Sequence, residues 1–130
     1  MVGEAPAGRR LATGQVVTVF RSRRRPGSDS EYRSLSKEML EAARTVPGFV
    51  DFKTFTAEDG EHVSLVTFAT PEAHQVWRND PRHRAAQQRG RDAFYLEYSI
   101  QVGECSHVSQ WYEGRSMSST DRLPTDRPAE

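Results

Sequence analysis

His83 is the side chain best suited to move a proton near neutral pH, because an imidazole has an ordinary pKa of about 6.5. It forms a row at helical spacing with Ala86, Gln87 and Gly90, which indicates that it faces inward. The alternative is a position on the helix surface, close to the Asp80–Pro81 pair that begins the same predicted helix. His83 is therefore a candidate base or proton shuttle.

Trp77 and Arg91 flank His83 in the sequence and offer two further kinds of contact. Trp77 shares a predicted helical face with Ala73, so we expect a core anchor whose indole also suits the wall of a pocket for a flat aromatic ligand. Residues 78–91 hold five arginines and one acid, Asp80, and most of these cations should lie on a solvated helix face. Arg91 stands at the junction of helix and strand, where we expect it to pair with an anion or oxyanion.

Other kinds of site find little support in the sequence. The four histidines show no His-x-His or His-x-x-x-His spacing, and Cys105 is the only cysteine, so no metal site and no intramolecular disulfide is expected. Cys105 is read as an inert thiol, and His74 as a surface residue. No Gly-x-Gly-x-x-Gly, P-loop or serine nucleophile elbow is present.

Composition narrows the class of protein. The 130 residues fit one domain, and 18 basic side chains balance 18 acidic ones, which argues against a nucleic-acid or polybasic membrane binder. No apolar run approaches the ~20 residues of a membrane-spanning helix, and no apolar segment follows Arg9–Arg10 as an export signal would require. We therefore expect a cytoplasmic protein.

The ends of the chain differ from its middle. Residues 1–14 and 113–130 have few large apolar side chains and are expected to be a disordered N-terminal segment and a disordered tail. The folded unit is expected at residues 15–103. Residues 104–112 end in Trp111 and Tyr112, which is unusual for a solvated tail, so this extension is expected to dock on a partner subunit or on the pocket.

Six elements are predicted between residues 15 and 102, counting two short adjacent helices as one helical region. Residues 15–22 have the pattern of a strand. A helix is predicted to follow: Ser28 and Glu31 have the spacing of a capping box at its start, and Pro47–Gly48 marks its end. Two strands follow at 49–56 and 62–68, joined by a turn at 58–60.

A second helical region follows these strands and leads to the last strand. Thr70–Pro71 and Asp80–Pro81 begin two short helices, the second ending at Gly90. The strand at 94–102 alternates apolar and polar residues, with Tyr95 expected on the face away from the core. This order is that of a ferredoxin-like split βαβ subunit of the α+β class, with a four-stranded antiparallel sheet covered by helices on one face.

Four motifs together resemble the antibiotic biosynthesis monooxygenase superfamily over residues 15–103: Pro47–Gly48–Phe49, the run from Trp77 to Gln87, Gly90–Arg91 and Phe94–Tyr95. The resemblance implies a homodimer, joined as a dimeric α/β barrel, with a pocket between sheet and helices in each subunit. Some relatives oxidise aromatic phenols such as anthrones to quinones with molecular oxygen and without metal or flavin. Others degrade haem, and sister families on this fold catalyse isomerisation or cyclisation.

The resemblance also suggests roles for particular residues. Trp77 matches the family's tryptophan, and His83 falls where relatives carry a polar aromatic residue or histidine. Thr18 stands where relatives often have asparagine, and it offers one hydroxyl in place of an amide. The leading expectation is a cofactor-free monooxygenase acting on an aromatic polyketide or phenol, with His83 for proton transfer, Arg91 for anion stabilisation and Trp77 for stacking. The residues expected to line the substrate pocket are Thr18, Phe52, His62 and Tyr98.

Two alternatives remain open on the sequence alone. The first is a haem-binding or haem-degrading enzyme, which needs an axial histidine facing a haem-sized cleft. The second is a cyclase or a non-catalytic accessory binding protein, which uses the same pocket without oxygen. Thr18 in place of asparagine is the feature that favours this second alternative.

Overall fold

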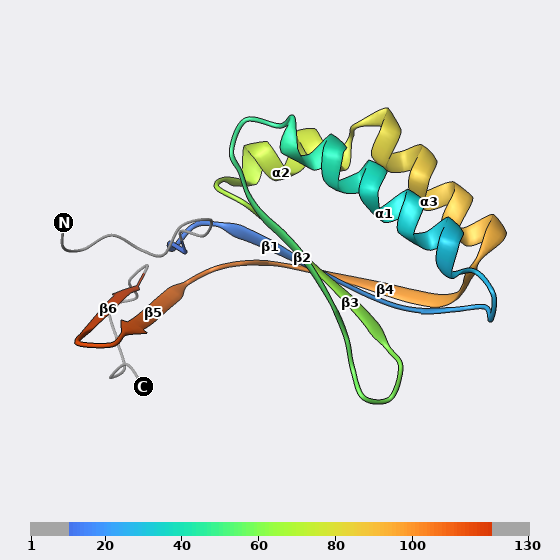
Figure 1. Ribbon diagram of the computed structural model, residues 1–130. Helices are drawn as coiled ribbons and strands as arrows, with labels where there is room; N and C mark the ends of the chain where they lie inside the picture. The colour runs from blue at the N-terminus through green and yellow to red at the C-terminus, as the bar shows by residue number, and fades with distance from the viewer. Residues whose placement is uncertain (1–10, 121–130) are drawn as a thin grey trace.

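A computed structural model describes residues 11–120. Within these residues nine elements follow one another (Figure 1): β1 (Val16–Arg24), α1 (Asp29–Arg44), β2 (Phe49–Thr56), β3 (His62–Phe68), α2 (Pro71–Arg78), α3 (Pro81–Ala93), β4 (Tyr95–Glu104), β5 (His107–Tyr112) and β6 (Arg115–Thr120). None of the helices in residues 11–120 is both long enough and apolar enough to cross a membrane.

The first seven elements form a two-layer α+β domain. Strands β1 to β4 make one antiparallel sheet in the order β2-β3-β1-β4, and α1, α2 and α3 all lie on one face of it (Figure 1). This arrangement confirms the predicted ferredoxin-like fold class. The opposite face of the sheet carries no helix among the described residues.

The core lies between the two layers. Phe68 and Ala43 are fully buried beside Val66 and Trp77, and a second cluster joins α1 to α3 through Leu35 and other apolar side chains. Each large apolar side chain buried in this way contributes about 1.5–3 kcal/mol. The apolar stripe of α1 predicted from the sequence faces this core, as expected for an amphipathic helix.

The register of β4 differs from the simple alternation predicted for it. A bulge opposite Arg23 and Arg24 inserts Leu96 as an extra residue, so Tyr95 pairs with Arg24 while Glu97 pairs with Arg23. One inserted residue reverses which face the earlier side chains occupy. The placement of Tyr95 on the face away from the core is therefore wrong: it lines the helix-covered face, whereas Leu96 is 59% exposed.

The cap of one helix and the end of another also differ from expectation. Helix α1 begins after Ser28, but no side-chain cap forms there, because the Ser28 hydroxyl instead donates to the carbonyl oxygen of Arg25 (2.7 Å). The capping box with Glu31 is therefore wrong. Helix α3 continues through Gly90 to Ala93, because Gly90 is not an end signal here but the point where the helix packs against the ring of Tyr95.

Strands β5 and β6 form a separate antiparallel hairpin. Figure 1 shows it beyond the end of the main sheet, away from the helical layer. The expectation of a disordered tail over 113–130 is thus wrong for residues 115–120, which pair with β5 instead. The remaining expected disorder, in residues 1–10 and 121–130, lies outside the described residues.

Candidate functional site

A cavity of about 430 Å³ lies between the sheet and the helical layer. Strands β1, β2, β3 and β4 supply its floor, and all three helices supply its roof. Its middle is apolar and aromatic, lined by Phe20, Leu35, Met39, Phe52, Val66 and Ala86. A concave space of this size with mostly apolar walls is typical of a site for a small organic ligand.

The cavity also contains polar atoms that lack protein partners. Thr18 Oγ1, Trp77 Nε1 and His83 Nδ1 are all buried and make no hydrogen bond, although each residue lines the cavity. The imidazole of His83 lies on the indole of Trp77, with ring centroids 4.0 Å apart. Because a buried polar atom without a partner costs about 1–3 kcal/mol, the protein retains three such atoms where a ligand can satisfy them.

His83 is held in the neutral form needed of a base. Burial is the main cause that lowers its pKa, while a hydrogen bond to the backbone of Arg78 and the charge of Asp80 act in the opposite direction. The Nδ1 atom of His83 is buried without a hydrogen-bond partner in the protein, so in the neutral tautomer that leaves this nitrogen unprotonated its lone pair is available to accept a proton.

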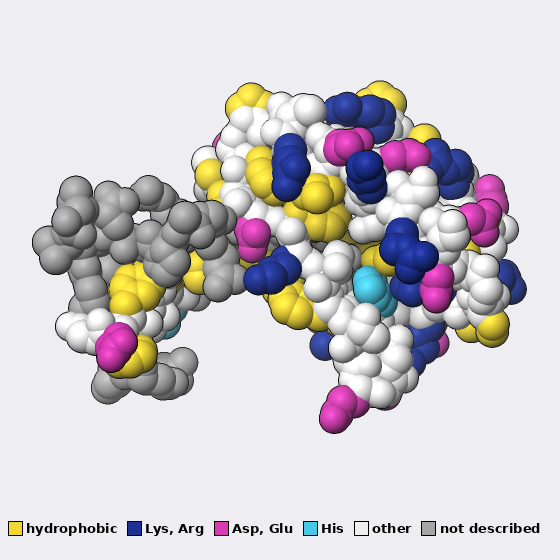
Figure 2. Space-filling view, viewed as in Figure 1, with side chains coloured by type: hydrophobic (Ala, Val, Ile, Leu, Met, Phe, Trp, Pro, Cys, Tyr) yellow, Lys and Arg dark blue, Asp and Glu magenta, His cyan; other side chains and the backbone are white. Residues whose placement is uncertain are grey.

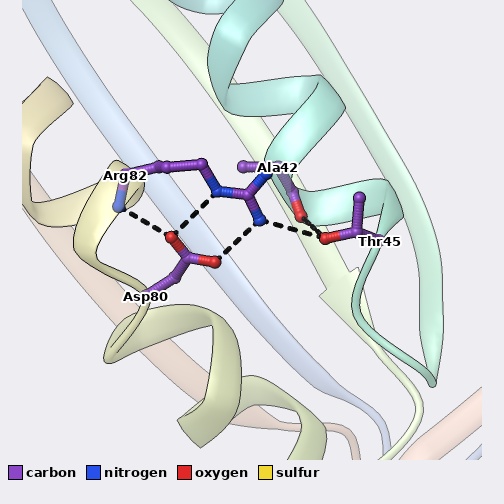
Figure 3. Close-up of polar contacts among 4 residues, drawn as sticks. All are labelled: Ala42, Thr45, Asp80 and Arg82. Carbon is purple, nitrogen blue, oxygen red and sulfur yellow. Dashed lines mark hydrogen bonds and ion pairs between the residues drawn. The ribbon is translucent and has the colours of Figure 1, made fainter.

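The start of α3 fixes the position of His83. Asp80 caps the helix by accepting from the backbone N–H of Arg82 (2.7 Å), with Pro81 in the first helical position. The guanidinium of Arg82 binds both carboxylate oxygens of Asp80 and reaches Thr45 Oγ1 (3.1 Å), whose own hydroxyl donates to the Ala42 carbonyl (Figure 3). The end of α1 is thereby tied to the turn that carries His83.

Tyrosines line a second polar part of the cavity. Arg91 Nη1 donates to the hydroxyl oxygen of Tyr98 (2.7 Å), and Tyr95 packs edge-on against Phe20 with ring centroids 5.5 Å apart. Burial raises the pKa of Tyr95 far above its usual range, so this phenol stays protonated. The cation of Arg91 thus acts on the cavity through the hydroxyl of Tyr98.

The structure brings together five of the seven residues predicted for the site. Thr18, Phe52, Trp77, His83 and Tyr98 all line the cavity.

The remaining two predicted residues do not line the cavity. Arg91 contacts it through Tyr98, as described above. His62 lies behind Tyr32, with ring centroids 4.8 Å apart, and its Nδ1 is 3.0 Å from Thr56 Oγ1. His62 faces the helical layer because it pairs with Ser22, but Tyr32 separates it from the cavity.

His74 lines the cavity although it was not predicted to do so from the sequence. It was expected at the surface, but it is only 7% exposed and lines the cavity, so that expectation is wrong. The signal was present in the spacing, because His74 and Trp77 are three residues apart in α2 and therefore share a face. Burial lowers the pKa of His74, and the charge of Arg78 lowers it further.

The described residues offer no cluster of metal ligands, and their charged side chains are spread over the surface of the helices. Within residues 11–120, no group of three or more His, Cys, Asp or Glu side chains is placed to hold a metal ion. Figure 2 shows dark blue Lys and Arg side chains interspersed with magenta Asp and Glu over the helical layer. The arginines of α3 follow this pattern, since Arg89 pairs with Glu38 (3.1 Å) and Arg82 with Asp80 (2.9 Å). The helical surface is therefore mixed in charge, as the balanced composition predicts.

The amino-acid sequence is similar to those of two known proteins. A jasmonate monooxygenase of Pyricularia oryzae is 22% identical over 111 residues, covering 83% of this chain and 51% of the relative. The protein YqjZ of Bacillus subtilis is 26% identical over 77 residues, covering 59% of this chain and 68% of the relative. The chain thus spans about half the length of the jasmonate enzyme.

Solved structures share the fold at low sequence identity. SnoaB, a cofactor-independent oxygenase from Streptomyces nogalater, matches with a TM-score of 0.62 and 18% identity over 72% of this chain and 94% of that one. Rv0793 from Mycobacterium tuberculosis matches with a TM-score of 0.61 and 20% identity over 68% and 92%. The model of the antibiotic biosynthesis monooxygenase family matches residues 15–89, more than half of the sequence. The chain belongs to the antibiotic biosynthesis monooxygenase family.

Proposed function

We propose that this protein is a cofactor-independent monooxygenase that oxidises a flat aromatic substrate, of the polyketide or phenol class, to a quinone. The observation that carries the proposal is the set of three unpartnered polar atoms, on Thr18, Trp77 and His83, at one aromatic-walled cavity. The fold shared with SnoaB supports the assignment, since that protein is a cofactor-independent oxygenase.

The reaction begins with a proton transfer to His83. Nδ1 accepts a proton from an acidic C–H or O–H of the substrate, and the resulting carbanion or phenolate is electron-rich enough to reduce molecular oxygen directly. For an anthrone, a methylene group becomes a carbonyl group. One oxygen atom of O₂ enters the product, and the other leaves as water with the two hydrogens that the methylene loses.

Other residues of the cavity stabilise the charge that develops. Trp77 Nε1–H is a donor without a protein acceptor, so it is available to the substrate oxygen as negative charge forms there. The Thr18 hydroxyl is able to donate or accept, which suits a neighbouring phenol or carbonyl. At the tyrosine end, Arg91 polarises the hydroxyl of Tyr98 and favours an anionic ligand oxygen.

We also propose a cytoplasmic homodimer as the active form. The sheet face without helices carries apolar side chains, which are Val17, Val19, Phe55, Val63 and Leu65, and Phe55 is 47% exposed. A second copy would bury this face. The exposed Trp111 on the β5–β6 hairpin supports the proposal that residues 104–112 dock on that second copy, because no residue of this extension lines the cavity of its own chain.

Oxygen consumption by metal-free protein, with a panel of anthrones and hydroquinones, tests the proposed activity. We expect uptake above the spontaneous rate in the wild type and a loss of about a hundredfold or more in His83→Gln. His62→Gln is the matched control, because it removes a half-buried imidazole outside the cavity and should retain activity.

Two other results would favour one of the alternative functions. Absence of uptake with every substrate, in protein whose near-ultraviolet circular dichroism is intact, would contradict the oxygenase and favour the cyclase or accessory reading. A Soret band on titration with haem, lost in His83→Gln or His74→Gln, would favour the haem alternative instead.

A further inference from the structure

Three of the described side chains that line the cavity are exposed to solvent, and they mark where it opens. They are Arg78 in the last turn of α2 and two residues of β4, Ile100 (42% exposed) and Val102 (52% exposed). Strand β4 lies at the edge of the sheet, and Val102 pairs with Thr18 of β1. The opening therefore lies along β4 beside Thr18, and it combines one cation with two aliphatic side chains.

The guanidinium of Arg78 makes no hydrogen bond or ion pair within residues 11–120. The other four arginines of the segment 78–91 all bind protein side chains, which are Asp80 for Arg82, Asn79 for Arg84, Glu38 for Arg89, and Tyr98 and Gln88 for Arg91. Asp80 is the acid nearest to Arg78 in the sequence, but both its carboxylate oxygens are held by Arg82. Arg78 is thus the arginine of this segment whose donors remain available to a ligand.

The charge of the cavity is that of Arg78 alone. No acidic side chain of the described residues lines the cavity, and Arg78 is the one lining residue among them that carries a permanent charge. Burial lowers the pKa of His74 and His83, so both imidazoles are neutral near pH 7. The cavity therefore presents a single positive charge, and that charge lies at its opening.

We propose that Arg78 binds a carboxylate of the substrate, which is an aromatic carboxylic acid whose rings fill the cavity while its carboxylate stays at the opening. The planar guanidinium matches the two oxygens of a carboxylate. One positive charge balances this singly charged group, but it balances only part of the charge of a phosphate. The aliphatic side chains of Ile100 and Val102 suit the apolar part of the ligand next to its carboxylate. The aromatic body of the ligand rests on the proposed function, whereas the carboxylate is inferred from Arg78 and the opening.

Calorimetric titration with two unreactive probes of one ring system, anthraquinone-2-carboxylate and anthraquinone-2-carboxamide, tests the proposal without turnover. The wild type should bind the carboxylate about fivefold or more tightly than the uncharged carboxamide at low ionic strength. This preference should shrink at about 0.2 M salt, because an ion pair at the opening is screened by solvent ions.

Variants of Arg78 identify the side chain responsible for the preference. Arg78→Gln should abolish the preference and leave the Kd of the carboxamide unchanged, and Arg78→Lys should retain part of it, because lysine keeps the charge but not the planar fork. Arg84→Gln is the matched control, since it removes an equal charge from a nearby arginine that binds Asn79 and does not line the cavity. Equal Kd values for the two probes in the wild type would overturn the proposal. So would a preference that survives in Arg78→Gln, or a failure of both probes to bind.

Failure of this proposal can be told apart from failure of the oxygenase assignment. A protein that prefers the carboxylate through Arg78 but consumes no oxygen with any anthrone would support the anion site and contradict the oxygenase. A protein that oxidises carboxylated and uncharged anthrones with the same kcat/KM would overturn the anion site alone.

Discussion

Three polar atoms, on Thr18, Trp77 and His83, determine what the cavity can do at the scale of single residues. Each is buried without a protein partner, an arrangement that lowers the stability of the folded chain. Such an unfavourable arrangement is expected where a ligand completes the hydrogen bonds. These atoms are therefore expected to contribute to ligand binding and not to the stability of the fold.

Substitution Thr18→Val should affect stability and function in opposite directions. Removing an unpartnered buried hydroxyl should leave the free energy of unfolding unchanged or raise it by about 1 kcal/mol. Oxygen uptake should fall roughly tenfold, because the substrate loses one hydrogen bond of about 1 kcal/mol or more. Urea unfolding and oxygen consumption, measured on the same preparation, check both parts; a variant that loses stability and keeps its activity would contradict the assignment.

Stability should depend on pH through the buried histidines. Burial lowers the pKa of His62, His74 and His83, so the unfolded chain binds more protons than the folded one between the lowered values and about 6.5. Their contribution is fully present above that pH and is lost as the pH falls through this window.

Urea unfolding at about pH 7.5 and pH 5 measures this dependence. The wild type should be less stable at the lower pH, and the combined variant His74→Gln/His83→Gln should show a smaller difference between the two. An equal difference in both proteins would show that these imidazoles do not contribute.

Most residues of the site could be predicted from the sequence, but which of the histidines reach the cavity could not. Thr18, Trp77 and His83 were identified from residue type, spacing and resemblance, and all three line the cavity. His74 was missed because a polar residue in a short helix is usually exposed, and only the packing of α2 on Phe68 buries it. His62 was placed in the pocket, but the sequence does not reveal that the ring of Tyr32 lies in between.

At the scale of elements, the start of α3 fixes the position of His83, the proposed base. Arg82→Ala should remove the link between Asp80 and Thr45 and let the first turn of α3 move (Figure 3). We expect kcat to fall several-fold, with Arg82→Lys restoring little, because lysine lacks the planar fork that binds both carboxylate oxygens.

A surface arginine of the same helix is the matched control for Arg82. Arg89→Ala removes an ion pair with Glu38 in which both side chains are 55% exposed, and such pairs contribute little. Steady-state kinetics of the three variants should therefore show a defect in Arg82→Ala and none in Arg89→Ala. Equal activity in both would contradict the positioning role of Arg82.

Gly90 allows α3 and β4 to approach each other closely. A Cβ at this position would lie 2.7 Å from Cδ2 of Tyr95, well inside contact distance. Gly90→Ala should therefore destabilise the protein by about 1–3 kcal/mol, although alanine by itself favours a helix. The unfolding temperature of Gly90→Ala measures this effect. Gly103→Ala is the control, because a Cβ at Gly103 would meet no atom within 4 Å. A Gly90→Ala variant more stable than the wild type would contradict the claim.

The elements themselves were largely predictable, and their exceptions have local causes. The bounds of β2 and β3 agree with the sequence pattern because Gly48 and the turn at 58–60 mark their ends. The face of Tyr95 was not predictable, since a strict alternation gives no sign of the bulge at Leu96. The β5–β6 pairing was also missed, because residues 115–120 have the polar composition of a tail.

For the whole molecule, the hairpin and the open sheet face lead to a prediction about assembly. A two-stranded hairpin is only marginally stable alone, and Trp111 is 70% exposed. Trp111→Ser should therefore weaken the proposed homodimer by about tenfold in Kd or more, as loss of a buried aromatic anchor does. Analytical ultracentrifugation over a dilution series measures this, with Val76→Ser as a control for an exposed apolar residue on a helix. A wild-type chain that is monomeric at all concentrations would contradict the dimer.

The most direct test of the central claim follows isotopically labelled molecular oxygen into the product. Metal-free wild-type protein should form a quinone from an anthrone with one labelled oxygen atom per molecule, faster than the spontaneous reaction. The rate should fall about a hundredfold or more in His83→Gln and remain in His62→Gln. Product formation no faster than without protein, or equal rates in wild type and His83→Gln, would contradict a base-initiated oxygenase.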